Sequence, residues 1–215
     1  PNPTAIDRLG ERDAVAETGR KPYPCCRYLH AAIDGLREIA TEVDPGAVDS
    51  VRIAIPSAGV RLTGDPIESK RRPEGFVDCQ FSAPFVAALT LTAGDAGAGS
   101  FLRAAGRLDG PPRYEEPEMQ RLMDATSVGT DPEIERRFPE AWGAEVSVTA
   151  GGETHERSVR TPLGEPETPM SPEESRAKAE GLLAGTGVDA DRLVEVVETV
   201  NERTVAELVN AATVE

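Results

Sequence analysis

Residues 145–159, EVSVTAGGETHERSV, carry the clearest strand pattern in the chain. Val146 and Val148 alternate with polar residues, as apolar residues do in a strand that buries one face. Gly151 and Gly152 follow, and two glycines between such segments are typical of a tight hairpin turn. The chain is therefore expected to return as a second strand that ends near Val159. This hairpin is the centre of the predicted sheet.

Further strands are predicted upstream of the hairpin. The stretch SVRIAIP, residues 50–56, alternates Val51, Ile53 and Ile55 and ends at a proline, which predicts a half-buried strand. GVRLTGDP, residues 59–66, is a candidate hairpin partner for that strand. Residues 125–139 supply another strand ahead of the 145–159 hairpin.

Helices are predicted before, between and after these strands. Apolar residues recur every three or four positions from Cys26 to Val43, until Pro45 and Gly46 stop the pattern. Ser82 caps an almost wholly apolar helix that ends at Gly94, and a helix apolar all round must be buried all round.

Later helices open at Pro117 and at Ser171, where Ser171 and Glu174 match a capping box. The helices that follow residue 171 are expected to turn a set of apolar residues inward. These are Leu193, Val196, Val197, Val200, Val205, Leu208 and Val209. Four or so strands with helices around them predict an α+β fold, a two-layer α/β domain with a mainly antiparallel sheet.

The charge of the chain restricts its partners. Its 215 residues include 38 acidic and 23 basic side chains, for a net charge of −15. Such a surface repels phosphate backbones and anionic lipids, so we expect neither nucleic acid nor membrane as a partner. No apolar run reaches the roughly 18 residues of a membrane helix, and no secretion signal is visible, which predicts a soluble cytoplasmic protein.

Lysine is scarce in this chain. Only Lys21, Lys70 and Lys178 occur, beside 20 arginines. An acid-rich, lysine-poor composition suits a protein that stays solvated at high salt, and salt adaptation is our hypothesis. The start at Pro1 without methionine suggests that a longer polypeptide was cut or trimmed.

The cysteines and one histidine give no sign of a metal site. Cys25, Cys26 and Cys79 are odd in number and lack ligand spacing, so buried reduced thiols are expected instead of disulfides or zinc. His155, in the return strand of the hairpin, is predicted to be a surface residue.

The segment GRKPYPCCRYLHAAIDGL, residues 19–36, is chemically richer. Pro22 and Pro24 hold the chain extended, so that Lys21 projects ahead of the helix, and His30 lies one turn into it. By periodicity alone His30 is more simply a satisfied core residue, and Lys21 a solvated one.

This segment resembles the opening of the C-terminal domain of the MmgE/PrpD family, which includes 2-methylcitrate dehydratase, cis-aconitate decarboxylase and iminodisuccinate epimerase. The likeness continues in order from about Leu9 to the last helices. It includes DCQFSAPFVAALTLTAG from residue 78, LMDATSVGTDPEIERRFPEAWGAEVSVTAGGETHERSV from 122 and PLGEPETPMSPEESRAK from 162.

The resemblance implies an active site shared with a helical N-terminal domain. Residues 1–20 are then a connecting segment from that domain, and residues 21–215 form the α/β domain. Lys21 and His30 match the family's lysine and histidine and are the implied catalytic residues. Lys21 is also implied to hold a carboxylate of the substrate. Arg27 is a weaker candidate for the same role, and the alternative for Arg27 is a solvated arginine on the helix.

The resemblance further implies a function. It predicts a hydro-lyase of the 2-methylcitrate dehydratase type in propionate metabolism, acting on a small di- or tricarboxylate without metal or cofactor, and a homodimer. The isolated chain is expected to be inactive without its helical domain or subunit.

One departure from the family keeps other functions open. Phe85 stands where several relatives carry tyrosine. Isomerisation, epimerisation or decarboxylation of a related acid, and a noncatalytic binding or assembly domain, therefore remain alternatives.

Overall fold

The computed structural model describes residue 10, residues 14–15 and residues 17–214. Its centre is a four-stranded sheet in the order β2-β1-β3-β4. The strands are β1 (Val48–Ala54), β2 (Thr126–Gly129), β3 (Ala144–Ala150) and β4 (Glu153–Val159). The predicted hairpin is confirmed, with Ala150 paired to Glu153 and both turn glycines at positive φ.

The sheet is mixed, and the prediction of a mainly antiparallel sheet is wrong. β3 runs antiparallel to β1 and β4, but β1 and β2 are parallel. The chain between β1 and β2 crosses over through helices, which returns β2 in the direction of β1.

The helices before β2 are α2 (His30–Ala40), α3 (Ser57–Thr63), α4 (Ile67–Lys70), α5 (Phe76–Gln80), α6 (Ala83–Ala93), α7 (Ala98–Ala104) and α8 (Pro117–Asp124). After β2 come α9 (Pro132–Arg137), α10 (Pro172–Leu183), α11 (Ala190–Glu198) and α12 (Val205–Ala211). Short 3-10 turns are η1 (Arg27–Leu29), η2 (Pro45–Ala47), η3 (Arg113–Glu115) and η4 (Val200–Glu202).

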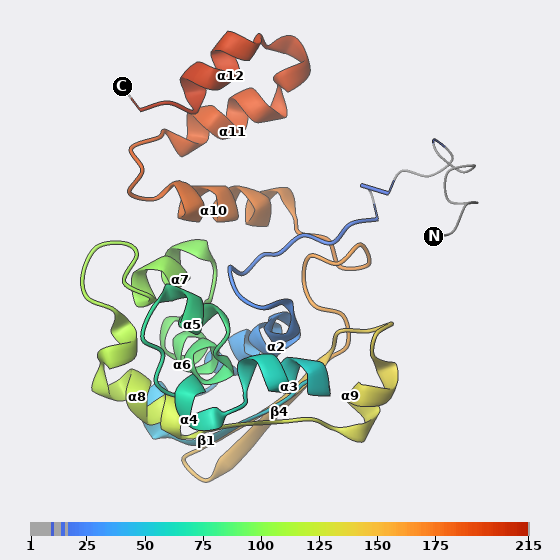
Figure 1. Ribbon diagram of the computed structural model, residues 1–215, viewed down its shortest axis with the longest axis vertical. Coiled ribbons are helices and arrows are strands. Elements are labelled where there is room, and N and C mark those ends of the chain that lie inside the picture. The colour runs from blue at the N-terminus through green and yellow to red at the C-terminus, as the bar shows by residue number, and fades with distance from the viewer. Residues whose placement is uncertain (1–9, 11–13, 16, 215) are drawn as a thin grey trace.

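The helices cover one face of the sheet, which confirms the two-layer architecture. α2 packs on β3 and β4, and α6 packs on α2 and α8 (Figure 1). Alternate residues of β3 are buried toward these helices, as the Val146 and Val148 pattern predicted. The α6 helix is buried along nearly its whole length, is capped by the Ser82 side chain, and ends at Gly94 in the left-handed region.

The predicted hairpin partner of β1 is wrong. Residues 59–66 fall mainly in α3, because both edges of β1 are already paired, with β2 and β3. Gly59 lets α3 approach the 19–36 segment, since a Cβ there would lie 2.8 Å from the Tyr28 side chain.

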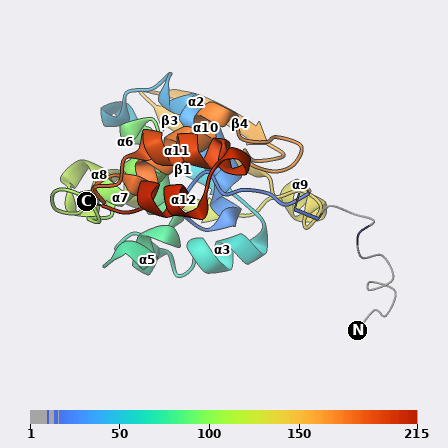
Figure 2. The same cartoon turned by 90° about the horizontal axis from the view of Figure 1, so that it is seen from above.

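Helices α10, α11 and α12 stack as a column beyond the α/β body (Figure 1), and Figure 2 looks onto α11 and α12 from above. Val196 is buried, but Val197, Val200, Val205 and Val209 are exposed, so the prediction that they face inward is wrong. A column of single helices has too little neighbouring surface to cover every apolar side chain.

Among the described residues, no single helix is long and apolar enough to cross a bilayer, and α6 with α7 passes that test only as a pair bent by 112°. The expected connecting segment, residues 1–20, and the start of the family likeness at Leu9 lie largely outside the described residues.

Candidate active site

The chain ahead of α2 is fastened to the end of α5. The Cys26 backbone N–H donates to the Gln80 carbonyl at 2.9 Å, and the Gln80 amide donates to the Pro24 carbonyl at 2.7 Å. The prolines keep this stretch extended, and η1 follows it before α2 begins at His30. Lys21, Arg27 and His30 are therefore held around one short, fixed backbone segment.

His30 is fully buried at the first position of α2. Its Nδ1 lies 2.9 Å from Nη1 of Arg27, and the Tyr23 ring packs edge-on against it with centroids 5.2 Å apart. A guanidinium has only donors, so Nδ1 accepts and the ring proton is assigned to Nε2. Nε2 has no hydrogen-bond partner in the described structure, which leaves His30 with a buried donor that lacks an acceptor.

Burial lowers the pKa of His30 to about 3. The positive charges of Arg27, Lys21 and Lys178 lower the pKa further, and the Cys25 backbone, whose contact with the ring falls outside ordinary hydrogen-bond geometry, opposes them. The imidazole is therefore neutral at neutral pH.

The charges of all three lysines act on titratable groups of this segment. Lys21 donates to the Cys25 carbonyl at 3.3 Å, and the charge of Lys178 helps to lower the pKa of His30. Burial raises the pKa of the Cys26 thiol, while a Tyr28 backbone hydrogen bond and the charges of Lys21 and Lys70 lower it. Within the described part of the chain none of these lysines forms an ion pair, whereas many arginines do.

Arg27 is not a solvated helix arginine. Its Nε donates to Oε1 of Glu165 at 3.0 Å, and its Nη2 pairs with the same oxygen. The Arg27 side chain is 15% exposed and that of Glu165 is 25% exposed. Arg27 thus joins His30 to a loop that lies 138 residues further along the chain.

A second polar network joins Tyr23 to Asp34 and Arg37 on α2. The Tyr23 hydroxyl donates to Oδ1 of Asp34 at 2.6 Å and accepts from Arg37 at 3.0 Å. The Leu163 N–H donates to Oδ2 of Asp34 at 2.7 Å. Burial, with Asp34 nearby, raises the pKa of Tyr23, so the hydroxyl stays protonated. Sequence reasoning missed this network, although Asp34 inside an apolar helical stripe was a signal for it.

Clefts flank the segment. One of about 420 Å³ lies between residues 22–23, α7 and α10, and Tyr23, Arg37, Arg103 and Lys178 are among its lining residues. Small residues allow α10 to reach α7 there, because a Cβ on Gly181 would lie 2.7 Å from the Gly99 nitrogen. Among the described residues, no group of three or more His, Cys, Asp or Glu side chains could hold a metal ion.

Phe85 belongs to the core. It is fully buried and packs edge-on against Phe101 at 5.3 Å and Tyr114 at 6.5 Å. Its backbone N–H donates to the Ser82 hydroxyl, which donates to the Lys70 carbonyl at 2.5 Å.

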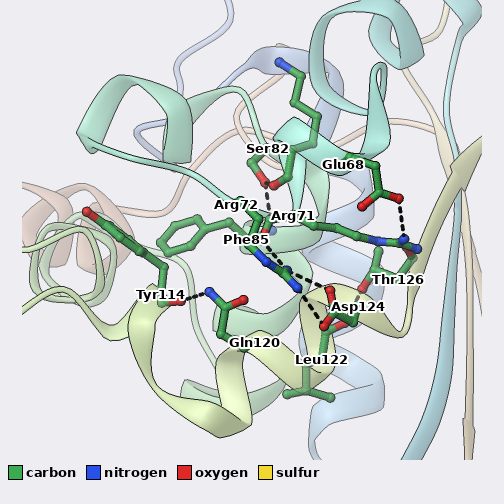
Figure 3. A network of polar contacts seen from close by, with 11 residues as sticks. Glu68, Arg71, Arg72, Ser82, Phe85, Tyr114, Gln120, Leu122, Asp124 and Thr126 are labelled. Carbon is green, nitrogen blue, oxygen red and sulfur yellow. Dashed lines mark hydrogen bonds and ion pairs between the residues drawn. The ribbon is translucent and has the colours of Figure 1, made fainter.

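Figure 3 shows how the loop that follows α4 is fixed near Phe85 through Arg71 and Arg72. Arg71 donates to the Thr126 carbonyl at 2.9 Å, and Arg72 pairs with Asp124 through two hydrogen bonds of 2.7 and 3.0 Å. Both arginines are therefore used to hold the loop against the α8–β2 junction.

The predicted surroundings of the three cysteines and of His155 can be compared with the structure. Cys25, Cys26 and Cys79 are free and buried, as expected. His155 is partly exposed on β4, and its Nδ1 lies 2.9 Å from Oε2 of Glu42, in the turn after α2, a partner that the sequence did not reveal.

The comparison with known protein families agrees with this architecture. No curated protein matches the chain. The sequence model of the MmgE/PrpD C-terminal domain matches residues 23–202, a range that contains Arg27 and His30 and begins just after Lys21. That range covers most of the chain, including the whole sheet and α10. The chain therefore belongs to the MmgE/PrpD family and contains its C-terminal domain.

Proposed function

We propose that this chain is the C-terminal half of a hydro-lyase of the 2-methylcitrate dehydratase type that acts on a small di- or tricarboxylate. The observation that carries the proposal is the family match over residues 23–202. The cationic surroundings of residues 25–30 agree with an acidic substrate.

Dehydration of a citrate-like acid removes a weakly acidic proton beside a carboxylate and protonates the departing hydroxide. Cations must hold the carboxylates in place and offset the charge that develops. Lys21, which no carboxylate neutralises among the described residues, suits the clamp. Its flexible ammonium can follow a carboxylate that enters from solvent.

His30 is assigned the role of a neutral hydrogen-bond donor. A pKa of about 3 makes its imidazole a weak base at neutral pH, while the Nε2–H remains available to an oxygen of the substrate. The proton-transfer groups would then come from the helical half. Full burial of His30 means that the site must open before this donor meets a substrate.

The same proposal covers the partner domain, the oligomeric state and the cellular location. A helical domain or subunit supplies the second wall of the active site, and two such units form a homodimer. The enzyme would work in the cytoplasm, in propionate metabolism, with no cofactor.

The test is turnover of 2-methylcitrate by this chain joined to, or mixed with, its helical half. Lys21→Ala and His30→Asn are each expected to abolish measurable turnover. The matched controls are Arg192→Ala, an exposed cation on α11, and His155→Asn, the second histidine. If Lys21→Ala and His30→Asn turn over as fast as the controls, the site assignment fails.

Product analysis separates the alternatives. Release of CO2 identifies a decarboxylase, and inversion of a stereocentre without loss of mass identifies an isomerase or epimerase. A chain that copurifies with no helical partner, and whose upstream coding region lacks about 250 residues of helical pattern, is a noncatalytic binding or assembly domain.

A further inference from the structure

The loop of residues 162–168 is braced by internal hydrogen bonds and packs against the 19–30 segment. Within the loop, the Gly164 N–H donates to the Thr168 carbonyl, and the Thr168 hydroxyl donates to the Pro162 carbonyl, both at 2.7 Å. The Arg20 N–H donates to the Gly164 carbonyl at 2.6 Å. The loop therefore presents the Glu165 side chain to Arg27 from a fixed backbone.

The Glu165 carboxylate uses only one oxygen for Arg27. Oε1 accepts from both Nε and Nη2, while Oε2 lies beside Gly19, where a Cβ would be 2.8 Å away. No hydrogen bond to Oε2 exists within the described part of the chain. This is half of the double pairing that a guanidinium and a carboxylate can make.

Open space borders Glu165 on two sides. One cleft of about 440 Å³ is lined by Thr18, Arg20, Glu165 and Met170 among others, and Glu165 is the only acidic residue among the described residues of its lining. The other, of about 490 Å³, is lined by Glu17, Glu140, Glu165 and Glu167 and by the cation Arg160. We call these the anion cleft and the acidic cleft.

We propose that the anion cleft binds a carboxylate group of a small anion, and that Glu165 is an internal carboxylate that occupies Arg27 until the ligand displaces it. The inference rests on the proposed function for the class of ligand. A carboxylate that enters beside Arg20 meets no acid except Glu165 among the described lining residues. Arg27 does not itself line the cleft, so the ligand reaches it when Glu165 turns away, and can then pair with it through both of its oxygens.

The exchange keeps Arg27 paired with a carboxylate. Arg27 changes one carboxylate for another, so its guanidinium still donates to Nδ1 of His30 and keeps the proton on Nε2. Glu165 can turn into the acidic cleft, where Arg160 is a cation in its lining. An ion pair largely out of water is costly to break without a replacement, which makes exchange the favoured route.

The experiment is a titration of the full 215-residue chain with citrate at fixed ionic strength, followed by tryptophan fluorescence. Trp142 is the only tryptophan, lines the acidic cleft with Glu165, and stacks on Tyr28 with centroids 4.6 Å apart. Movement of Glu165 into that cleft changes the surroundings of this single fluorophore.

Two variants release Arg27 by different means. Glu165→Gln removes the competing charge. Gly19→Ala changes no charge but crowds Oε2, and its Cβ also lies 3.2 Å from the Gly164 carbonyl oxygen. Each is expected to bind citrate at least roughly fivefold more tightly than the wild type, because about 1 kcal/mol is the value of an exposed ion pair and this pair is largely out of water. Glu167→Gln, an exposed acid of the same loop, is the charge-matched control and is expected to bind as the wild type does.

The proposal is overturned if Glu165→Gln binds no more tightly than Glu167→Gln, or if no variant binds citrate. Arg27→Gln must lose the binding that Glu165→Gln gains, and its circular dichroism shows whether it folds. These readouts need no turnover and no helical half, so a negative result here leaves the hydro-lyase assay to decide the proposed function by itself.

Discussion

Substitution of Gly164 by alanine tests whether the 162–168 loop packs on residues 20–22 as closely as the contacts indicate. Gly164 has a φ of +90°, which costs a residue with a Cβ about 1 kcal/mol. The new Cβ would also lie 2.2 Å from the Arg20 carbonyl oxygen and 3.1 Å from Pro22 Cδ. The segment around Arg20 must then move, which breaks the 2.6 Å hydrogen bond from its N–H to the Gly164 carbonyl at a cost of about 1 kcal/mol. The expected loss of stability is about 2–3 kcal/mol.

Gly110→Ala is the matched control for this substitution. Gly110 has a φ of +96° but nothing within 4 Å of an added Cβ, so it incurs only the backbone cost. Urea unfolding of both variants, with equal m-values, gives the difference in free energy of unfolding. If Gly164→Ala is no less stable than Gly110→Ala, the close packing of the loop on residues 20–22 is refuted.

Three further predictions concern the core, the buried histidine and the net charge. Phe85→Tyr places a hydroxyl in a fully buried aromatic cluster and should lower stability by about 1–3 kcal/mol in urea unfolding, whereas Phe81→Tyr, at a 39% exposed position, should have little effect. The unfolded chain protonates His30 near pH 6.5 but the folded chain only near 3, so stability present above pH 6.5 falls on acidification, by about 2 kcal/mol between pH 7 and 5. His30→Gln should lack this component, which His155→Gln retains; equal pH dependence in both would contradict the burial of a neutral imidazole. The melting temperature should rise between low and molar potassium chloride, because salt screens the repulsion of a −15 chain, and an unchanged value would count against salt adaptation.

Local patterns predicted much of the fold because each was set by neighbouring residues. The Gly151–Gly152 turn, the Ser82 cap and the Ser171 capping box all depend on contacts within a few positions, and the structure contains each of them. The parallel pairing of β1 with β2 depends on how the helices between them cross the sheet. No local periodicity records that path.

The candidate site was predictable in its residue types but not in its connections. Lys21 and His30 stood out through the 19–36 segment, but the partner of Arg27 is Glu165, at a separation of 138 positions. Glu165 is one of 38 acidic residues, and nothing in its Pro-rich surroundings distinguishes it. Whether an acid neutralises a particular cation is decided by tertiary packing.

The different use of lysine and arginine explains how so acidic a chain could attract an acidic ligand. The planar fork of arginine suits carboxylates, and arginines such as Arg27 and Arg72 are held by internal acids. The three lysines have no such partners among the described residues, so their charge near residues 25–30 is not cancelled locally. Repulsion from the −15 net charge acts over distances that salt screens, since the Debye length is about 8 Å at physiological ionic strength, while contacts near 3 Å persist. High salt therefore removes more of the repulsion than of the attraction, and an anion site of this kind becomes compatible with an acidic surface.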